Sequence, residues 1–308
     1  MHFSFWATSG NSWDDILAGC HHAETTGWDG VWVPDHFMPP PGGYGEGLGS
    51  SDGSELGPVH EAWVLLGALA AVVPRVRVGA MVSGITYRHP AVLANMVATL
   101  DHVSGGRAVL GIGAGWQENE HQRYGLALGS PAERSDRFEE ACEVIVGLLT
   151  DRRTTFAGRY YQLDGAPMEP KPLQDPLPVV IGGAGEQRTL RTVARWANES
   201  NVWGGPDVQR EKGEVLARHC DDVGRDVGEI RRTAAAMLTI TDDEATADRI
   251  SAPMAHRGAL VGTIDQLRRR LDEFADAGID ELVVPDFNLA PGEREVMLDR
   301  FMEEVVGR

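Results

Sequence analysis

Residues 76–113 read VRVGAMVSGITYRHPAVLANMVATLDHVSGGRAVLGIG, and this stretch decides the fold. It begins and ends with apolar, β-branched runs, residues 76–82 and 107–113, which predict two strands. Pro90, a good first helical residue, opens the segment between them. That segment carries an apolar stripe at helical spacing, formed by Leu93, Met96, Val97 and Leu100. A strand, a helix and a second strand in this order predict two parallel strands in one sheet.

The same alternation runs through the whole chain of 308 residues. Strands are predicted over eight short runs: residues 3–6, 31–34, 76–82, 107–113, 177–182, 199–203, 235–240 and 281–284. Most of these runs are apolar throughout, as in strands that are buried on both faces. Eight strands alternating with helices predict an α/β fold, and their number and the chain length favour a (β/α)8 TIM barrel over an open, doubly wound sheet. We expect residues 1–308 to form a single barrel domain.

Three helix starts carry capping signals. Ser12 precedes a helical stripe whose first turn is acidic. Ser130 and Glu133 have the spacing of a capping box, and Thr263 and Gln266 repeat that spacing. Helices are therefore expected to begin at these three points.

A barrel of this kind takes about 250 residues, so the chain must carry insertions. Residues 39–58 are rich in Gly and Ser and show no periodicity, which predicts a mobile loop and leaves open whether it acts as a lid. Residues 154–178 hold a β-rich stretch and a Pro-rich return, which predicts a hairpin before the fifth strand. We expect both insertions at the C-terminal face of the strands.

The chain has 28 Lys and Arg against 46 Asp and Glu, a formal net charge of −18. Nucleic-acid binding needs a basic surface, so this composition argues against a nucleic-acid partner. Cys20, Cys142 and Cys220 are far apart and lie in helical patterns, which predicts buried thiols rather than disulfides or a zinc site. The sequence shows no signal peptide, membrane span or paired metal-ligand spacing, so we expect a cytoplasmic protein without a metal.

Barrel enzymes bind their ligands at the carboxyl ends of the strands. Asp35 and His36 follow the second predicted strand, and a His there can donate to a ligand carbonyl or exchange a proton near neutral pH. The alternative is structural: Asp35 caps the loop and His36 packs on a neighbouring aromatic ring. Gly111, Gly113 and Gly115 fit a dinucleotide fingerprint poorly and favour close approach of a flat ligand to the backbone.

A second glycine run follows the fifth predicted strand and precedes a helical stripe. Free N–H groups at a helix start favour an anion, so this run predicts a phosphate site, with a flexible strand-to-helix turn as the alternative. Arg188, Thr189 and Arg191 are close enough in sequence to help. The run consists of Gly182, Gly183, Ala184 and Gly185.

Six motifs occur in a fixed order along the chain. They are HAETTGWDGVWVPDHF (22–37), YRHPAVLA (87–94), LDHVSGGR (100–107), LGIGAGW (110–116), PKP (170–172) and IGGAGE (181–186). In this order they resemble the luciferase-like monooxygenase superfamily, and in particular its branch that uses the 8-hydroxy-5-deazaflavin coenzyme F420. The resemblance covers nearly the whole chain.

The resemblance implies a flavin or deazaflavin at the carboxyl ends of the barrel strands. Asp35 and His36 would lie near its ring. Members often carry a non-prolyl cis peptide at the end of the third strand, which maps to Met81 and Val82. The further cofactor-binding residues that it implies are Ser83, Gly115, Asn119, Gly182, Gly183, Ala184, Gly185 and Thr189.

Two departures bear on the substrate. Sugar-phosphate dehydrogenases of the F420 branch have a Trp near the position of Pro40 and a catalytic Glu near that of Trp116, and this chain has neither. Bacterial luciferase has an Arg for the FMN phosphate near the position of Ala114, and its absence here argues against FMN.

The resemblance therefore implies an F420-dependent oxidoreductase that transfers a hydride between the cofactor C5 and a small organic substrate. His36 is the first candidate for polarising the ring or passing a proton, and Glu118 and Glu120 follow. An FMN-dependent monooxygenase using O2 is the alternative, and a barrel that binds a cofactor without catalysis is another. Family members are often dimers, and the sequence leaves open whether this chain forms a homodimer.

Overall fold

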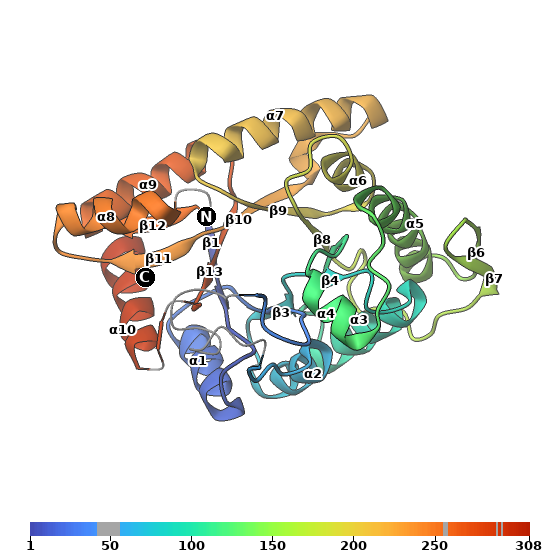
Figure 1. The fold of residues 1–308 in the computed structure, drawn as a ribbon, viewed down its shortest axis with the longest axis horizontal. Coiled ribbons are helices and arrows are strands. Elements are labelled where there is room, and N and C mark those ends of the chain that lie inside the picture. Colours follow the sequence, from blue (N-terminus) through green and yellow to red (C-terminus); the bar gives the residue numbers. More distant parts are fainter. Residues whose placement is uncertain (42–55, 255–257, 288, 291) are drawn as a thin grey trace.

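The computed structural model describes residues 1–41, 56–254, 258–287, 289–290 and 292–308. Eight parallel strands form its centre (Figure 1). The pairing of β3 with β5 closes the ring, so the predicted TIM barrel is confirmed. In ring order the strands are β1 (His2–Trp6), β2 (Gly30–Val33), β3 (Arg77–Ala80), β5 (Ala108–Gly113), β8 (Val179–Gly182), β9 (Glu199–Trp203), β10 (Arg231–Ala235) and β13 (Glu281–Pro285).

Helices cover the outside of the ring (Figure 1). They include α1 (Trp13–Thr25), α2 (Ala62–Val72), α3 (Pro90–Ser104), α4 (Glu118–Tyr124), α5 (Pro131–Thr150), α6 (Thr189–Trp196), α7 (Pro206–Val223), the short η1 (Val227–Glu229), α9 (Ile264–Asp276), α10 (Glu293–Arg300) and the π-helical η3 (Phe301–Val306). The predicted caps at Ser12, Ser130 and Thr263 are confirmed, the last two as complete capping boxes. In the part of the chain that the structure describes, no helix has both the length and the apolar composition that crossing a membrane requires.

The seventh barrel strand lies earlier than predicted. It is β10, which pairs with β9 and β13, whereas residues 235–240 were predicted. Most of the predicted run is β11 (Met237–Ile240), which pairs with β12 (Ala259–Gly262) outside the ring, with α8 (Glu244–Met254) between them. The prediction was wrong because β10 begins with two arginines and so lacks the apolar run that predicts a buried strand.

Residues 154–178 contain the predicted hairpin, formed by the antiparallel strands β6 (Thr154–Ala157) and β7 (Gln162–Ala166). The hairpin stands beside α5 at the edge of the molecule (Figure 1). Its predicted place at the C-terminal face was wrong, because the segment joins the end of α5 to the start of β8. Gln174 Nε2 accordingly donates to the carbonyl of Ala108, the first residue of β5, at 2.8 Å. Of the other predicted insertion, 39–58, residues 42–55 lie outside the described residues.

Apolar side chains pack in two layers. The larger layer lies between the ring and the helices and includes the predicted stripe residues Ile16, Leu93, Phe138 and Phe274. The three cysteines are unpaired and buried, as expected. The second layer fills the inside of the ring with Trp6, Trp32, Met81, Val109, Val180, Ala235, Met237, Val283 and Phe287.

The first residues of four barrel strands form an ion cluster, which we call the amino-end cluster: Arg77, Glu199, Arg231 and Glu281. Arg77 and Arg231 each lie 3.0 Å from Glu281 Oε2, and Arg77 also pairs with Glu199. The Glu281 side chain is only 1% exposed and also accepts from the Ser4 hydroxyl. Burial raises the pKa of Glu199, since the neighbouring arginines do not fully compensate for it.

A second buried ion pair lies at the opposite end of the barrel. Asp286 follows the carboxyl end of β13 and accepts the Thr8 N–H at 2.8 Å. Arg294 of α10 places Nη1 3.5 Å from Asp286 Oδ2, and both side chains are 1% exposed. Burial raises the pKa of Asp286 to about 6, although Arg294 acts in the opposite direction.

Candidate active site

Three strand ends bring the polar side chains of the candidate site together. β2 leads into His36, and β5 leads into α4, which carries Glu120. The short strand β4 (Ser83–Gly84), which pairs with β5, leads into Tyr87. The carboxyl ends of parallel strands meet at one end of a barrel, and that is where the site was predicted.

His36, Glu120 and Tyr87 form the centre of the site, and we call them the His36 cluster. His36 Nδ1 lies 2.8 Å from Glu120 Oε1, and the Phe37 N–H donates to Glu120 Oε2 at 2.8 Å. The Tyr87 hydroxyl donates to Glu120 Oε1 and lies 3.3 Å from His36 Nδ1. The Glu120 side chain is 0% exposed, whereas that of His36 is 11% exposed. Two of the predicted catalytic residues are therefore in direct contact.

The neighbours of Glu120 stabilise its charge. Burial acts to raise the pKa of the Glu120 carboxyl, but hydrogen bonds from His36, Phe37 and Tyr87 outweigh it and lower the pKa below its ordinary value. Glu120 is therefore a carboxylate at neutral pH. A carboxylate can only accept hydrogen bonds, so His36 Nδ1 carries the proton that lies between the two side chains.

His121 packs on the ring of Tyr87, and Thr86 holds His121 by a hydrogen bond. His121 Nδ1 lies 2.6 Å from the Gln117 carbonyl oxygen, and its Nε2 lies 2.7 Å from Thr86 Oγ1. The carbonyl only accepts, so Nδ1 donates to it and Nε2 accepts from the Thr86 hydroxyl. The His121 ring stacks on the Tyr87 ring at a centroid distance of 5.1 Å. Tyr87 is thus fixed by both its ring and its hydroxyl.

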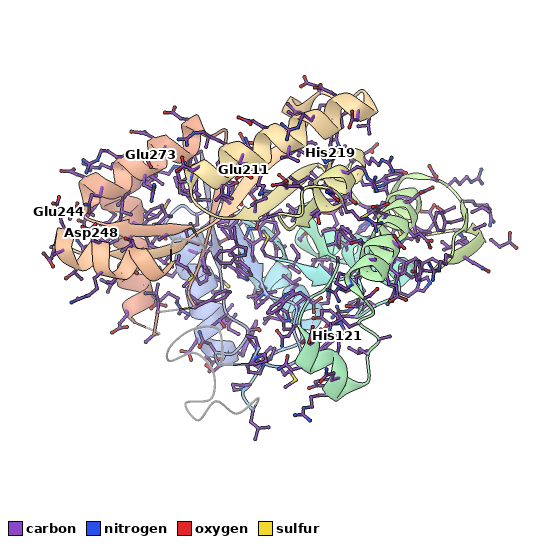
Figure 2. The ribbon with its side chains drawn as sticks, turned by 45° about the horizontal axis from the view of Figure 1, so that its top comes forward. His121, Glu211, His219, Glu244, Asp248 and Glu273 are labelled. Atoms are coloured by element: carbon purple, nitrogen blue, oxygen red, sulfur yellow. The ribbon has the colours of Figure 1, made fainter. Side chains whose placement is uncertain are left out.

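Acidic side chains also gather on the outer helices. Figure 2 shows Glu211, Glu244, Asp248 and Glu273 on α7, α8 and α9, well separated from His121 on α4. All four are exposed. The net charge of −18 therefore includes carboxylates that do not face the candidate site. Among the described side chains, no group of three or more His, Cys, Asp or Glu residues could hold a metal ion.

Asp35 is engaged in a salt bridge. Arg88 Nη1 and Nη2 donate to its two carboxylate oxygens at 2.6 and 3.2 Å, and the same guanidinium pairs with Glu61, the N-cap of α2. The Asp35 side chain is 0% exposed. This bidentate pair fixes the loop that carries His36. The predicted contact of Asp35 with a cofactor ring stays a prediction.

The polar residues at the start of α4 differ in their exposure to solvent. Glu118, a predicted catalytic residue, is exposed, whereas Asn119 is buried. Gln117 Nε2 donates to the Met38 carbonyl at 2.9 Å, and Asn119 Nδ2 donates to the Pro39 carbonyl at 3.0 Å. Within the described part of the chain, the amide oxygens of Gln117 and Asn119 are buried without a hydrogen-bond partner. A ligand N–H would satisfy such an oxygen.

The peptide bond between Met81 and Val82 is cis, as expected. Val82 lies against two strand-end glycines: a Cβ at Gly113 or at Gly182 would come within 3.0 Å of its methyl groups. A Cβ at Gly111 would lie 1.9 Å from the Ala80 carbonyl oxygen. Gly111 and Gly113 therefore make room for the turn after β3, and the expectation that they admit a flat ligand stays a prediction.

Two further predicted cofactor residues contact neighbouring elements of the chain, the helix α2 and the segment before Tyr87. Ser83 Oγ accepts the Trp63 indole N–H at 2.9 Å. Gly115 has a φ of +85°, and a Cβ there would lie 2.7 Å from Thr86 Oγ1. Both residues fix the loops around Tyr87, and their contact with a cofactor stays a prediction.

The turn after β8 presents backbone groups and one carboxylate, that of Glu186, which pairs with Lys212. Residues 183–187 are exposed, and Gly183 has a φ of +135°, a region that glycine adopts readily. A Cβ at Gly185 would lie 2.7 Å from the Thr189 hydroxyl, at the start of α6. Backbone N–H groups and a hydroxyl at a helix start suit an anion.

Arg188 and Arg191 face the helix α5 instead. Arg188 lies 2.7 Å from Asp136 and 3.0 Å from Glu139. Arg191 lies 2.9 Å from the same oxygen of Glu139. The expectation that these arginines help to hold an anion at the glycine turn is therefore not supported, because α5 carboxylates already pair with them.

Aromatic rings line the carboxyl end of the barrel. Trp6 lies 5.6 Å from Trp203 and 5.0 Å from Phe287, measured between ring centroids. Trp6 Nε1 is buried and has no hydrogen-bond partner among the described residues. On the other side, His36 contacts the ring of Trp116, which is 59% exposed. A flat aromatic ligand would find apolar surfaces and an indole donor here.

Comparison with known proteins decides the family. A family model described as luciferase-like monooxygenase matches residues 1–256. This chain belongs to the luciferase-like monooxygenase family. The resemblance that the six motifs carried is confirmed.

Relatives of this luciferase-like chain include an uncharacterised protein of Mycobacterium tuberculosis, 33% identical over 138 residues, which are 45% of this chain and 48% of that protein. The chain thus matches about half the length of the first curated relatives. An F420-dependent glucose-6-phosphate dehydrogenase of Kineococcus radiotolerans is 34% identical over 241 residues, 76% of this chain and 67% of that enzyme. The solved structure of an F420-dependent secondary alcohol dehydrogenase with an F420-acetone adduct matches with a TM-score of 0.83 and 20% identity, over 99% of this chain and 98% of that one. This last likeness supports the barrel fold.

Sequence reasoning missed the roles of Tyr87 and Arg88 in this luciferase-like site. Both follow the third barrel strand and open the motif at 87–94, so their position was the available signal. Their partners Glu120 and Asp35 lie 33 and 53 residues away in sequence. No local pattern connects residues at such separations.

Proposed function

We propose that this protein is an F420-dependent oxidoreductase that transfers a hydride between the deazaflavin and a small organic substrate. The observation that carries the proposal is the contact between His36 and the buried Glu120, at the carboxyl ends of the barrel strands. The Kineococcus relative, which is named as an F420-dependent enzyme, supports the choice of cofactor.

The residues at the barrel mouth fit such a cofactor. Asn119 Oδ1 and Trp6 Nε1 offer a buried acceptor and a buried donor that lack partners among the described residues. The exposed turn after β8 would offer N–H groups that follow Gly183 to a phosphate, since the Gly183 N–H itself donates to the Asn201 carbonyl at 3.0 Å. The further proposed contacts are Asp35, Met81, Val82, Ser83 and Gly115 around the ring and Gly182, Gly183, Ala184, Gly185 and Thr189 around the phosphate.

The chain would supply proton transfer and a dry surface. When bound, the deazaflavin provides a hydride at its C5 carbon. His36 keeps Nδ1 on Glu120 and exchanges the proton of the reaction at Nε2. Trp6, Trp203 and Phe287 exclude water from the centre of the barrel mouth.

A titration with oxidised F420 tests the cofactor. Trp6 and Trp116 lie at the site, so binding should quench tryptophan emission and change the deazaflavin fluorescence, both with saturation. FMN serves as the matched comparison. Fluorescence that stays unchanged over a wide range of protein concentrations would contradict the proposal.

The His36→Ala variant tests the proton-transfer role. We expect F420 affinity to stay within about twofold of wild type and turnover to fall roughly 10²–10⁴-fold, the usual contribution of a general acid or base. His22→Ala is the control, because His22 pairs with Asp299 on the outer side of α1. Full turnover by His36→Ala would remove His36 from the mechanism.

The second candidate is an FMN-dependent monooxygenase, which the description of the matching family favours. A protein that purifies yellow and consumes O2 with reduced FMN and substrate would support it. Saturable binding of F420 without binding of FMN would exclude it.

We also propose that two copies pair through the outer faces of α2 and α3. Val64, Val92 and Val103 on these helices are 77%, 53% and 48% exposed. Exposed apolar residues on two helices that contact each other favour contact with another surface. Light scattering should report twice the chain mass of 33.4 kDa, and a Val64→Glu, Val92→Glu double variant should report one chain mass.

A further inference from the structure

The two side chains that hold His36 carry an inference beyond the proposed cofactor. We propose that Glu120 and Tyr87 are positioning residues, which hold His36 by Nδ1 so that only Nε2 exchanges a proton with a bound molecule. This inference rests on the proposed function for its chemistry and on the His36 cluster alone for its geometry.

Glu120 is placed to orient rather than to react. Its side chain is 0% exposed, so no part of it reaches a molecule in the barrel mouth. Oε2 accepts the Phe37 N–H, and Oε1 accepts from His36 and Tyr87. The earlier expectation of Glu120 as a catalytic group is therefore replaced by a role that acts through His36.

The chemistry of the donors fixes which nitrogen exchanges. The Glu120 carboxylate accepts only, and its pKa is lowered by its hydrogen bonds despite burial, so it does not return a proton to Nδ1 at neutral pH. The Nδ1–H bond is therefore retained in both charge states of the ring. The proton that the ring gains or loses is the one on Nε2.

Tyr87 completes the arrangement without joining the proton exchange. Its hydroxyl donates to the same oxygen that accepts from His36, and its ring is stacked on His121. His121 is held in turn by the Gln117 carbonyl and Thr86. A phenol fixed in this way stabilises the carboxylate charge and prevents Glu120 from rotating away from the imidazole.

The proposed step balances for a carbonyl substrate. A bound reduced deazaflavin would be the reductant and would supply the hydride for the new C–H bond at the carbonyl carbon. His36 gives the Nε2 proton to the carbonyl oxygen, and the electron pair of that N–H bond stays on Nε2. The ring ends neutral with Nδ1–H still bonded to Glu120, and solvent returns the proton to Nε2.

Nitrogen NMR of the histidine side chains tests the geometry without cofactor or turnover. The His36 signals, identified by their loss in His36→Ala, should show the Nδ1–H tautomer whenever the ring is neutral. In Glu120→Ala the same ring should populate both tautomers. A wild-type His36 with the proton on Nε2 when neutral would overturn the inference, whatever the protein binds.

Kinetics of Glu120→Gln test the consequence for chemistry. The amide oxygen can still accept from Nδ1, but the charge is lost. F420 affinity should stay within about twofold, and kcat should fall roughly 10- to 100-fold, the range typical of a group that orients a His ligand or base. The pH above which turnover falls should move down by about one unit, because the imidazolium loses an anionic neighbour. Unchanged kcat and pH profile would contradict the positioning role.

Tyr87→Phe is a second test that keeps the ring stacking on His121. It removes one donor to Glu120, so we expect the same direction of change and a smaller size, with kcat reduced roughly 3- to 10-fold. Tyr124→Phe is the matched control, since the Tyr124 hydroxyl donates to the Phe37 carbonyl at 3.2 Å from an exposed position. If F420 does not bind at all, the proposed function fails while the tautomer measurement still decides the inference.

Discussion

Both ends of the barrel bury a glutamate, and they pair it with different partners. At the amino end Glu281 lies between Arg77 and Arg231, whose charges do not change with pH in the working range. At the carboxyl end Glu120 lies between His36 and Tyr87, which contact it through an imidazole nitrogen and a phenol hydroxyl. Burial of a charge therefore does not mark a chemical site in this protein. The two ends differ in the partner of the glutamate, which is a guanidinium at the amino end and an imidazole with a phenol at the carboxyl end.

The largest effect is expected from Glu281→Ala. The change leaves the partly buried Arg77 and Arg231 without their shared counter-charge, and Arg77 keeps only Glu199. Breaking a buried pair costs about 3–5 kcal/mol of unfolding free energy, and we expect the lower end of that range here. Urea unfolding measures the loss. F420 affinity of the folded protein should stay within about twofold. Glu304→Ala is the control, because Glu304 is half exposed and pairs with Arg300 at the surface. Lost F420 binding at unchanged stability would abolish the contrast between the two ends.

Asp286 combines features of both ends of the barrel. It lies at the carboxyl end, as Glu120 does, but it pairs with an arginine, as Glu281 does. Its pKa rises from 3.8 to about 6 on folding, so between these pH values the folded protein holds a proton that the unfolded chain has lost. The contribution of this group to stability is therefore greatest at low pH and falls by roughly 3 kcal/mol as the pH rises to about 6.

Asp286→Asn should remove that dependence. Urea unfolding of both proteins between about pH 4 and pH 6.5 measures the difference in unfolding free energy, and the variant should gain relative to wild type as the pH rises. Parallel curves for the two proteins would show that Asp286 does not titrate in this window.

A moderate effect is expected at Gly182, the last residue of β8, which lies against Val82. In Gly182→Ala the new methyl group would lie 3.0 Å from both methyl groups of Val82, and such overpacking costs about 1–3 kcal/mol. F420 affinity should fall as well, since Val82 has to move. Gly67→Ala in α2 is the matched control: nothing lies within 4 Å of its Cβ, so this helix should gain about 0.5–1 kcal/mol. Equal stability of the two variants would contradict the close packing.

The smallest effect is expected from Arg188→Ala. Asp136 and Glu139 already pair with this arginine, so its loss should change F420 affinity less than about twofold and cost at most about 1 kcal/mol of stability. A loss of affinity above tenfold would show that Arg188 leaves α5 and joins the phosphate site.

The fold could be predicted where the signal is local. The capping boxes at Ser130 and Thr263 and the apolar run at 107–113 depend on neighbours within a few residues, and the structure confirms them. The start of β10 was not predicted because its first residue is Arg231. This arginine pairs with Glu281, which lies 50 residues further along the chain. The short stretch of sequence that forms a strand does not show which distant residue its side chains will pair with.

The candidate site could be predicted as single residues but not as a cluster. His36 and Glu120 follow from the rule that barrel chemistry lies at the carboxyl ends of strands. Their contact joins residues 84 apart, and Tyr87 enters through a third loop. Asp35 shows the converse: its type and place suit a ligand, yet both of its oxygens bind Arg88.

The closed ring has a consequence for how the chain folds. β1 lies between β2 and β13, and Ser4 on β1 bonds to Glu281 on β13 across 277 positions of sequence. At a synthesis rate of about 5–20 residues per second, roughly 15–55 s separate the two strands on the ribosome. During that time β1 has an edge without its final partner, and unpaired edges favour aggregation. We therefore expect the late arrival of β13 to govern the yield of folded protein during synthesis.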